Sequence, residues 1–420
     1  MPMPFPRPML QKLALACGLA AALGVAHAAP DARLLAAAQD AQPALIADLK
    51  AMVEIESGSQ NVEGLRRMAD WVEARLKAIG FQTERRKAMS GPGADTVVAT
   101  RRGSGQRKLM LQGHMDTVYP AGVLASQPYR VEDKRIYGPG IADDKGGLAV
   151  ILHALRILSD AGWKDYDTIT VVMNPDEEIG SMGSAELIAT LGEQQDVVLS
   201  FEPGAGSAVM PGQPLLLGAA GVGSARLEVK GRASHAGAAP ELGRNALIEL
   251  SHRLLQTHEV TKDMPGVKLN WTVASANGPL NQITENAYAV GDVRILQPGA
   301  EKALDAALQA KIGSPPLIPD TETRVTVQTG RPAYLAGPKG RALAEKAKDI
   351  YRELGRELAL IPMTGGGTDA AFAARSGKAA VLESFGLAGF GYHARDEYIE
   401  IDSIVPRLYL VTRLLMDVSK

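Results

Sequence analysis

The segment KLMLQGHMDTV, residues 108–118, is a short apolar run that passes directly into a histidine and an aspartate. A run of this length between turn residues is typical of a buried strand. Three further runs of the same kind follow, at Thr168–Met173, Val197–Phe201 and Ala379–Leu382. An amphipathic helix is predicted between the first two runs, directly after Asp143 and Asp144. This alternation predicts an α/β domain with a mostly parallel central sheet.

The middle of the chain has a different order of elements. The predicted strands and helices are, in chain order, Arg226–Lys230, a helix at Asn245–Gln256, Lys268–Ser275, Ala287–Ile295, a helix at Lys302–Lys311, and Arg324–Gln328. The order β-α-β-β-α-β is that of a ferredoxin-like (α+β) domain. Because the α/β pattern resumes after Arg331, we expect this domain to be inserted at 221–332. The larger domain would then consist of 29–220 and 333–420.

The first 28 residues have the pattern of a signal peptide. A weakly basic start (Arg7, Lys12) precedes the apolar run Leu13–Val25, and AHA at 26–28 supplies a small-x-small cleavage pattern. The run is shorter than the roughly 20 residues that a membrane span needs. We therefore expect a periplasmic or secreted protein. Cys17 is the only cysteine, so no disulfide is expected after this segment.

The charge of the chain argues against two classes of partner. The sequence carries 45 Lys and Arg against 47 Asp and Glu, a formal net charge of −2. No basic block stands out along it. We therefore expect neither a nucleic acid nor a membrane as a partner.

Acids and histidines cluster where the predicted strands end. They are His114 and Asp116 after the first strand, Asp176, Glu177 and Glu178 after the second, Glu202 after the third, and His393 beyond the fourth. In open α/β sheets, ligands bind beyond the carboxyl ends of the strands. Nitrogen and oxygen donors without any thiol at one sheet edge suit a zinc site.

Each residue taken alone also has an ordinary explanation. A lone histidine is more often packed or solvated than a ligand, Asp143 could cap the helix after it, and a Glu-Glu pair could form a solvated turn. Two spacings favour the metal site. His114 and Asp116 point to the same side of an extended segment, which lets the carboxylate hold the second ring nitrogen. Glu177 and Glu178 are adjacent, so one can bind metal while the other moves a proton.

Seven motifs occur in order along nearly the whole chain after residue 28. They are GHMDTV (113–118), GPGIADDKGG (138–147), NPDEEIGS (174–181), SFEP (200–203), GRASHAGAAPELGRNA (231–246), TGGGTDA (364–370) and GFGYHA (389–394). The set resembles that of the co-catalytic zinc hydrolases. This family includes carboxypeptidase G-type glutamate carboxypeptidases, which are most similar, acetylornithine deacetylases and succinyl-diaminopimelate desuccinylases.

The resemblance implies an active site with two zinc ions per subunit on the larger, catalytic domain. The implied ligands are His114 and Glu202 on one ion, Glu178 and His393 on the other, and Asp143 between the two. Glu177 would be the general base and acid, and Asp116 would orient His114. Five ligands around two ions leave room for a water molecule, as a catalytic site requires.

The resemblance also gives the inserted domain a role as a lid and dimerisation domain. His235, which by its surroundings is typical of a turn, would reach into the partner subunit's active site and help to hold the oxyanion. Since the family dimerises through this domain, we expect a homodimer.

A further group of residues is implied in substrate binding. Asn281, Arg294 and Arg331 would hold the substrate, with the two arginines on its carboxylate, although a surface arginine is more often only solvated. The backbone of Gly366, Gly367 and Thr368, just before a helix expected near Asp369, would cradle the same anion or would form only a tight turn.

This sequence differs from the glutamate carboxypeptidases at one position that bears on the substrate. The glutamate carboxypeptidases have a lysine shortly after SFEP that favours the glutamate side chain, whereas Gly204–Leu217 contains no lysine and has Pro214 near that place. We expect an exopeptidase that releases a C-terminal amino acid, glutamate first, from small folate-like, N-acyl or peptidyl conjugates with a free carboxylate. One alternative is an N-acyl amino acid deacylase of the same family. Another, from a different class, is a non-catalytic periplasmic solute-binding protein.

Overall fold

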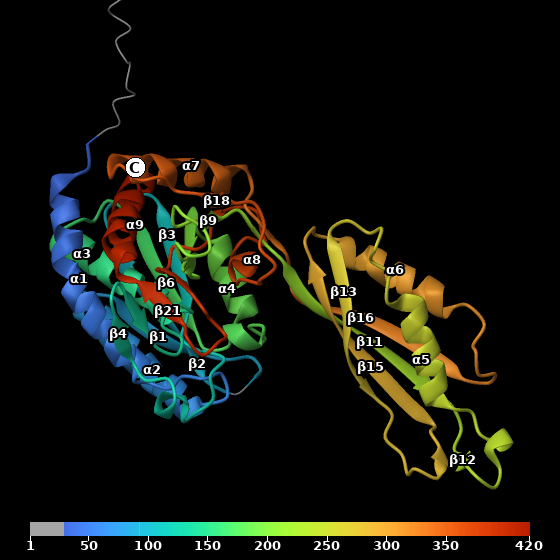
Figure 1. The fold of residues 1–420 in the computed structure, drawn as a ribbon. Coiled ribbons are helices and arrows are strands. Elements are labelled where there is room, and N and C mark those ends of the chain that lie inside the picture. The colour runs from blue at the N-terminus through green and yellow to red at the C-terminus, as the bar shows by residue number, and fades with distance from the viewer. Residues whose placement is uncertain (1–28, 92) are drawn as a thin grey trace, which may run out of the picture.

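The structure, a computed structural model, describes residues 29–91 and 93–420. The predicted signal peptide, residues 1–28, therefore lies outside the described residues. Two separate hydrophobic cores divide the described chain, one formed by residues from 34–219 and 334–415 and a smaller one by residues from 225–325. Figure 1 shows them as two bodies joined by two crossing segments.

A six-stranded sheet forms the centre of the larger body. Its strands, in spatial order, are β1 (Gln82–Lys87), β2 (Asp95–Arg102), β6 (Thr168–Asn174), β3 (Lys108–His114), β7 (Val197–Ser200) and β19 (Ala380–Leu382). The four predicted strands are confirmed, and they pair in parallel as β6·β3, β3·β7 and β7·β19. The sheet as a whole is mixed, because β1 and β2 add antiparallel pairs at one edge. The strand β1 was not predicted, because its residues, QTERRK, are polar throughout.

Helices surround this sheet. They are α1 (Ala32–Val53), α2 (Val62–Ala78), α3 (Lys145–Asp160), α4 (Ala185–Glu193), α7 (Pro338–Glu353), α8 (Ala370–Ala373) and α9 (Ile404–Val418). The helix α3 is the one predicted after Asp143 and Asp144, and it packs against α1, α9 and β3. Its apolar positions are buried almost all round, which anchors the residues at its start in the core.

Short elements shape the surface above the strand ends. A five-stranded sheet joins β4 (Arg130–Glu132), β5 (Arg135–Tyr137), β21 (Tyr398–Glu400), β20 (Ala388–Phe390) and β8 (Gly204–Ala205). Two-stranded pairs form between β9 (Leu215–Leu216) and β18 (Leu360–Ile361) and between β10 (Gly218–Ala219) and β17 (Tyr334–Leu335). The single-turn helices of the larger body are η1 (Val123–Ala125), η2 (Glu177–Ile179) and η4 (Ile401–Ser403), whereas η3 (Pro240–Leu242) belongs to the smaller body. Because β10 and β17 lie on the two crossing segments, their pairing holds both segments together where they leave the larger body.

The smaller body has the predicted β-α-β-β-α-β order. Its elements are β11 (Gly221–Lys230), α5 (Ala246–Thr257), β13 (Val267–Ser275), β15 (Asn286–Ile295), α6 (Ala300–Ile312) and β16 (Glu322–Arg331). The strands pair antiparallel in the order β13-β15-β11-β16, which is the ferredoxin-like arrangement. A ribbon of β12 (Ser234–His235) and β14 (Gln282–Ile283) extends from the end of this sheet that lies away from the larger body (Figure 1).

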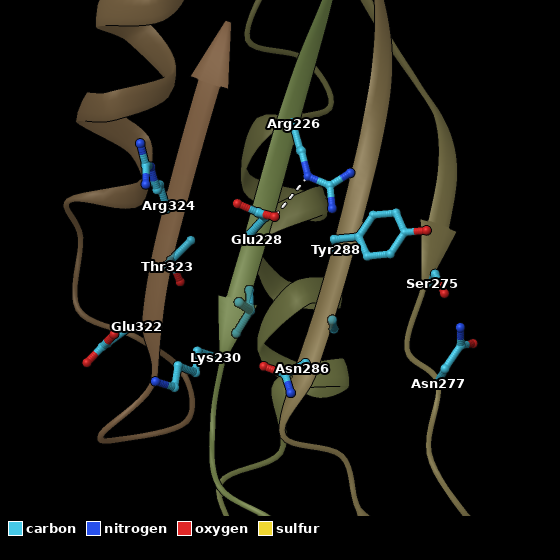
Figure 2. A pocket seen from close by; sticks show the side chains of 12 residues that line it. Arg226, Glu228, Lys230, Ser275, Asn277, Asn286, Tyr288, Glu322, Thr323 and Arg324 are labelled. Atoms are coloured by element: carbon cyan, nitrogen blue, oxygen red, sulfur yellow. Dashed lines mark hydrogen bonds and ion pairs between the residues drawn. The ribbon is translucent and has the colours of Figure 1, made fainter.

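The two faces of this sheet differ in chemistry. In β11, Leu227 and Val229 are buried beneath the helices, whereas Arg226 and Glu228 alternate onto the opposite face. There the Arg226 guanidinium lies 4.2 Å from the centre of the Tyr288 ring and donates to Glu228 at 2.8 Å (Figure 2). The face away from the helices is therefore polar. Among the helices of the described chain, none combines the length and apolar character needed to cross a bilayer.

Candidate metal centre and substrate cavity

The five predicted metal ligands come from four different strand ends and one helix start. His114 is the last residue of β3, Glu202 lies two residues beyond β7, and Glu178 lies in η2, shortly after β6. Asp143 precedes α3, and His393 lies between β20 and β21. Since β3, β6 and β7 run in parallel, their carboxyl ends deliver these side chains to one edge of the sheet.

These side chains form two groups that share one aspartate. In the first group, Nε2 of His114 lies 2.9 Å from Oδ1 of Asp143 and 3.8 Å from Oε2 of Glu202. In the second, Nε2 of His393 lies 3.4 Å from Oδ2 of Asp143 and 3.0 Å from Oε2 of Glu178. In each group the potential ligand atoms all lie within 4.8 Å of one another. Asp143 thus turns one carboxylate oxygen toward each group.

The charges in the two groups fit bound cations. Burial and the nearby Glu177 carboxylate raise the pKa of Glu202, and burial and Asp143 raise that of Glu178. Hydrogen bonds to Asp143 and Glu178 raise the pKa of His393 to about 10. Oε1 of Glu178 is buried and has no hydrogen-bond partner. Crowded carboxylates, imidazole nitrogens and an unpaired buried oxygen suit a hard or borderline divalent ion.

Asp116 connects the first group to the Glu177-Glu178 turn. Its Oδ1 lies 3.3 Å from Nδ1 of His114, the ring nitrogen that does not face the metal group. The same carboxylate accepts the backbone N–H groups of Glu177 at 3.0 Å and Glu178 at 3.1 Å, and the Ser59 hydroxyl at 2.8 Å. Nδ1 of His114 also hydrogen-bonds to the Asp116 backbone carbonyl at 3.0 Å, so Asp116 holds the ligand ring chiefly through its main chain and the adjacent turn through its fully buried carboxylate.

Glu177 faces the same cavity and forms an ion pair that the sequence did not predict. Its Oε1 lies 2.7 Å from Nη1 of Arg331, and its backbone carbonyl accepts from Nη2 at 2.6 Å. Nη2 also donates to Ser181 at 3.1 Å and lies 3.3 Å from Oδ1 of Asp369. Burial raises the pKa of Glu177, and the positive charge of Arg331 opposes that rise. Arg331 was predicted to hold substrate; in the structure its guanidinium is buried and already has carboxylate partners.

A cavity of ≈1160 Å³ lies beside the metal groups, between the larger body and the root of the inserted sheet. The predicted residues that line it are Asp143, Glu177, Glu178, Glu202, His393, Arg294, Arg331, Gly366, Gly367 and Thr368. Arg294 pairs with Asp292 at 2.9 Å and reaches the Gly365 carbonyl at 3.5 Å. Among the described residues that line this cavity, the basic side chains are those of Arg294, Arg331 and His393, and none is a lysine.

The Gly365–Thr368 turn differs from the predicted anion cradle in one respect. The helix after it, α8, starts at Ala370 and has four residues, so it supplies little of the helix dipole on which that prediction rested. The Thr368 side chain is buried, and its hydroxyl donates to Glu383. A substrate anion there would therefore be held by backbone groups of this turn and not by the Thr368 side chain.

His235 and Asn281 lie elsewhere, at the far end of the inserted body. His235 is in β12, which Figure 1 places at the end remote from the larger body, and the Asn281 carbonyl accepts the Ala236 N–H at 2.8 Å. Neither residue lines the cavity of its own chain. Nδ1 of His235 accepts the N–H groups of Gly237 and Ala238, both at 3.1 Å. In a neutral ring this leaves the proton on Nε2.

Several residues of the site were not identified from the sequence. Ser181 and Asp369 contact Arg331, and Tyr392 lines the cavity next to His393. All three lie inside the motifs quoted above. Their contacts could not be predicted, because they join residues far apart in the sequence, from 38 positions for Arg331 and Asp369 to 188 for Ser181 and Asp369.

Comparisons with known proteins agree with this geometry. The model of Peptidase family M20/M25/M40 matches residues 110–417. Carboxypeptidase G2 of Pseudomonas sp. (strain RS-16) is 44% identical over 422 residues, covering 98% of this chain and 99% of that protein. Succinyl-diaminopimelate desuccinylase of Stenotrophomonas maltophilia (strain R551-3) is 30% identical over 364 residues, covering 82% of this chain and 92% of that protein.

Solved structures show the same fold at lower sequence identity. A tripeptidase from Staphylococcus aureus subsp. aureus mu50 has a TM-score of 0.75 at 21% identity, covering 90% of this chain and 98% of that one. An M20 family metallo-carboxypeptidase from Sulfolobus solfataricus has a TM-score of 0.69 at 18% identity, covering 88% and 98%. The resemblance found in the motifs is confirmed: the chain is a member of peptidase family M20/M25/M40, a family of metal-dependent hydrolases of peptide and amide bonds.

Proposed function

We propose that the protein is a zinc-dependent exopeptidase that hydrolyses the amide bond to a C-terminal amino acid, with glutamate as the first candidate. The observation that carries this proposal is the pair of ligand groups sharing Asp143, with the Glu177 carboxylate in the same cavity. A solute-binding protein needs no such base, and the family is hydrolytic, so that alternative is set aside.

The roles of the residues follow from their places. Two zinc ions on the two groups would polarise the scissile carbonyl and lower the pKa of the attacking water. Glu177 takes a proton from that water and delivers it to the leaving amine nitrogen. Arg331, at 2.7 Å, keeps the Glu177 carboxylate turned toward the cavity. Asp116 holds the His114 ring by its outer nitrogen.

The substrate carboxylate would bind beside Arg294. This guanidinium lines the cavity, is about one-third exposed, and lies next to the glycine turn at Gly365–Gly367. Arg331 is buried against Glu177 and Asp369, whereas Arg294 pairs with Asp292 but keeps an exposed guanidinium edge, so Arg294 is the arginine that can bind a substrate carboxylate. A second carboxylate, as in glutamate, finds no lysine in Gly204–Leu217. We therefore expect release of a C-terminal amino acid with a weak preference for glutamate.

A deacylase is the second candidate function. The desuccinylase relative, at 30% identity, favours it, because its name describes removal of an acyl group from an amine. Both reactions break the same bond and differ in which side of it is recognised. The cavity can therefore accommodate either reaction. Dependence of the rate on the acyl group would distinguish a deacylase from a carboxypeptidase.

We propose a homodimer formed through the inserted domain, 221–332. On α5, Leu247, Ile248 and Leu255 are 44, 45 and 73% exposed and form one stripe, while Leu250 is buried on the other side of the helix. A second copy would cover this surface. His235 of one subunit would then enter the other subunit's cavity, where its Nε2–H can donate to the developing oxyanion.

The remaining proposals concern organisation and location. We propose that 29–220 and 333–420 form the catalytic domain and that the inserted domain also acts as a lid. We propose that residues 1–28 are a signal peptide and that the protein is periplasmic or secreted, on the sequence pattern alone.

A substrate panel tests the proposed function. One acyl group is joined to glutamate, aspartate, phenylalanine and glycine, and in a second series acetyl, succinyl and dipeptidyl groups are joined to glutamate. We expect hydrolysis that a chelator abolishes and zinc restores, with less than about tenfold variation across the first series. Strong dependence on the acyl group with indifference to the released residue would favour the deacylase. No hydrolysis of any member by the zinc-loaded protein would overturn the proposal.

A further inference from the structure

Glu397 lies behind the metal groups and binds none of the ligand atoms, yet four donors converge on its buried carboxylate. Oε1 accepts the backbone N–H groups of Ala142 at 2.8 Å and Asp143 at 3.0 Å. Oε2 accepts the Gly140 N–H at 2.8 Å and contacts the Tyr119 hydroxyl at 2.7 Å. Such a concentration of donors on one carboxylate fixes the backbone that surrounds it.

The same contacts connect three chain segments that carry metal ligands. Tyr119 follows His114 by five residues, and Gly140–Asp143 is the loop that ends in the shared ligand. The Tyr119 hydroxyl also lies 2.7 Å from the Ala394 carbonyl, directly after His393. Glu397 and Tyr119 together therefore touch the segments of three ligands.

The segment of His393 needs such support. His393 has a backbone φ of 62°, in the left-handed region that residues other than glycine adopt at an energetic cost. Its side chain is 54% exposed, so packing does little to hold it. The Tyr119 hydroxyl has a single proton for its two acceptors, the Glu397 carboxylate and the adjacent Ala394 carbonyl, so it supports this turn from the interior through a hydrogen bond shared between them.

We propose that Glu397, acting with Tyr119, is a positioning residue that sets the separation of Asp143 and His393 before the metal ions bind. A ligand set held in place in the metal-free protein loses less conformational freedom on binding, so its affinity is higher. Groups behind the direct ligands typically change metal affinity by about 10–100-fold. The inference rests on the proposed two-zinc centre and adds residues that hold it in place.

Zinc titration of the metal-free protein at buffered free zinc tests the inference, with bound zinc counted per subunit. Glu397→Ala should weaken both binding steps by about 10–100-fold, because Asp143 serves both groups. Glu397→Gln keeps one acceptor oxygen and should lie between Ala and the wild type. Tyr119→Phe should weaken chiefly the step that uses Glu178 and His393.

Glu249→Gln is the matched control. Glu249 is also fully buried, accepts a backbone N–H from Ile318 at 2.8 Å and pairs with Arg253, but it lies in the inserted domain. Its substitution should lower thermal stability without changing zinc affinity. Wild-type affinity in folded Glu397→Gln and Tyr119→Phe would overturn the inference, as would an equal loss in Glu249→Gln. A wild-type protein that takes up no zinc would instead overturn the proposed function.

Discussion

Arg331 is the side chain whose removal should affect stability most clearly. Arg331 is 6% exposed, and its guanidinium lies 2.7 Å from the Glu177 carboxylate and 3.3 Å from that of Asp369. Arg331→Met keeps the aliphatic stem but leaves both buried carboxylates without their cation. Breaking a buried pair from one side typically costs about 3–5 kcal/mol. We expect a loss of that size in the free energy of unfolding of the metal-free protein.

Denaturant unfolding of four proteins measures this loss and its origin. They are the wild type, Arg331→Met, Glu177→Gln and the double variant. Fluorescence follows both bodies, since Trp71 and Trp163 lie in the larger one and Trp271 in the inserted one. If the pair is the cause, the loss caused by Arg331→Met should be smaller by about 0.5–3 kcal/mol in the Glu177→Gln background.

Arg294→Met is the control for the same experiment. Arg294 lines the same cavity but is 35% exposed and pairs with Asp292 on its own strand, so its loss should cost under about 1 kcal/mol. Both variants should lose hydrolytic activity, and only Arg331→Met should lose stability. The reasoning fails if Arg331→Met is as stable as Arg294→Met, or if its cost is the same whether residue 177 is Glu or Gln.

Three further predictions concern other parts of the molecule. Leu255→Asp should give a monomer in sedimentation, because it places a charge in the exposed stripe of α5; a dimer of unchanged affinity would rule out that interface. His235→Ala should lower kcat by about 10²–10³-fold with zinc content unchanged; normal turnover would rule out its oxyanion role. Hydrogen bonds from Thr83 and Lys77 lower the pKa of Glu73 to about 2, so its stabilisation is present above pH 4.5 and lost toward pH 2. Glu73→Gln should therefore flatten the fall in melting temperature over that range, and an unchanged fall would contradict this.

The sequence predicted most of what hydrophobic periodicity controls. The four apolar runs became adjacent parallel strands, and the ferredoxin-like order was correct, helped by the alternation of more and less buried residues along β15 and the second half of β11. The edge strand Gln82–Lys87 was not predicted, because its side chains are all polar or charged and show no apolar alternation. The helix expected near Asp369 does start there, at Ala370, but it has only four residues, a length that the signal for its start did not specify.

The candidate site was predictable where ligands follow strands. Each strand end fixes where its next side chain lies, so His114, Glu178 and Glu202 could be placed together from sequence spacing. The ion pair between Glu177 and Arg331 could not be placed, because 154 residues and an entire inserted domain separate the two. Glu397 was not predicted for a related reason: three of its four partners are backbone N–H groups, which any residue could supply, and the fourth, Tyr119, lies 278 residues away.

Glu177→Gln tests the central claim most directly, because it removes the proposed base while keeping the size of the side chain. The variant is loaded with zinc, its metal content is measured, and its kcat on an N-acyl glutamate is compared with that of the wild type. The account predicts two zinc ions per subunit in both proteins and a fall in kcat of at least about 10²–10⁴-fold in the variant. A zinc-loaded Glu177→Gln protein with wild-type turnover would contradict it.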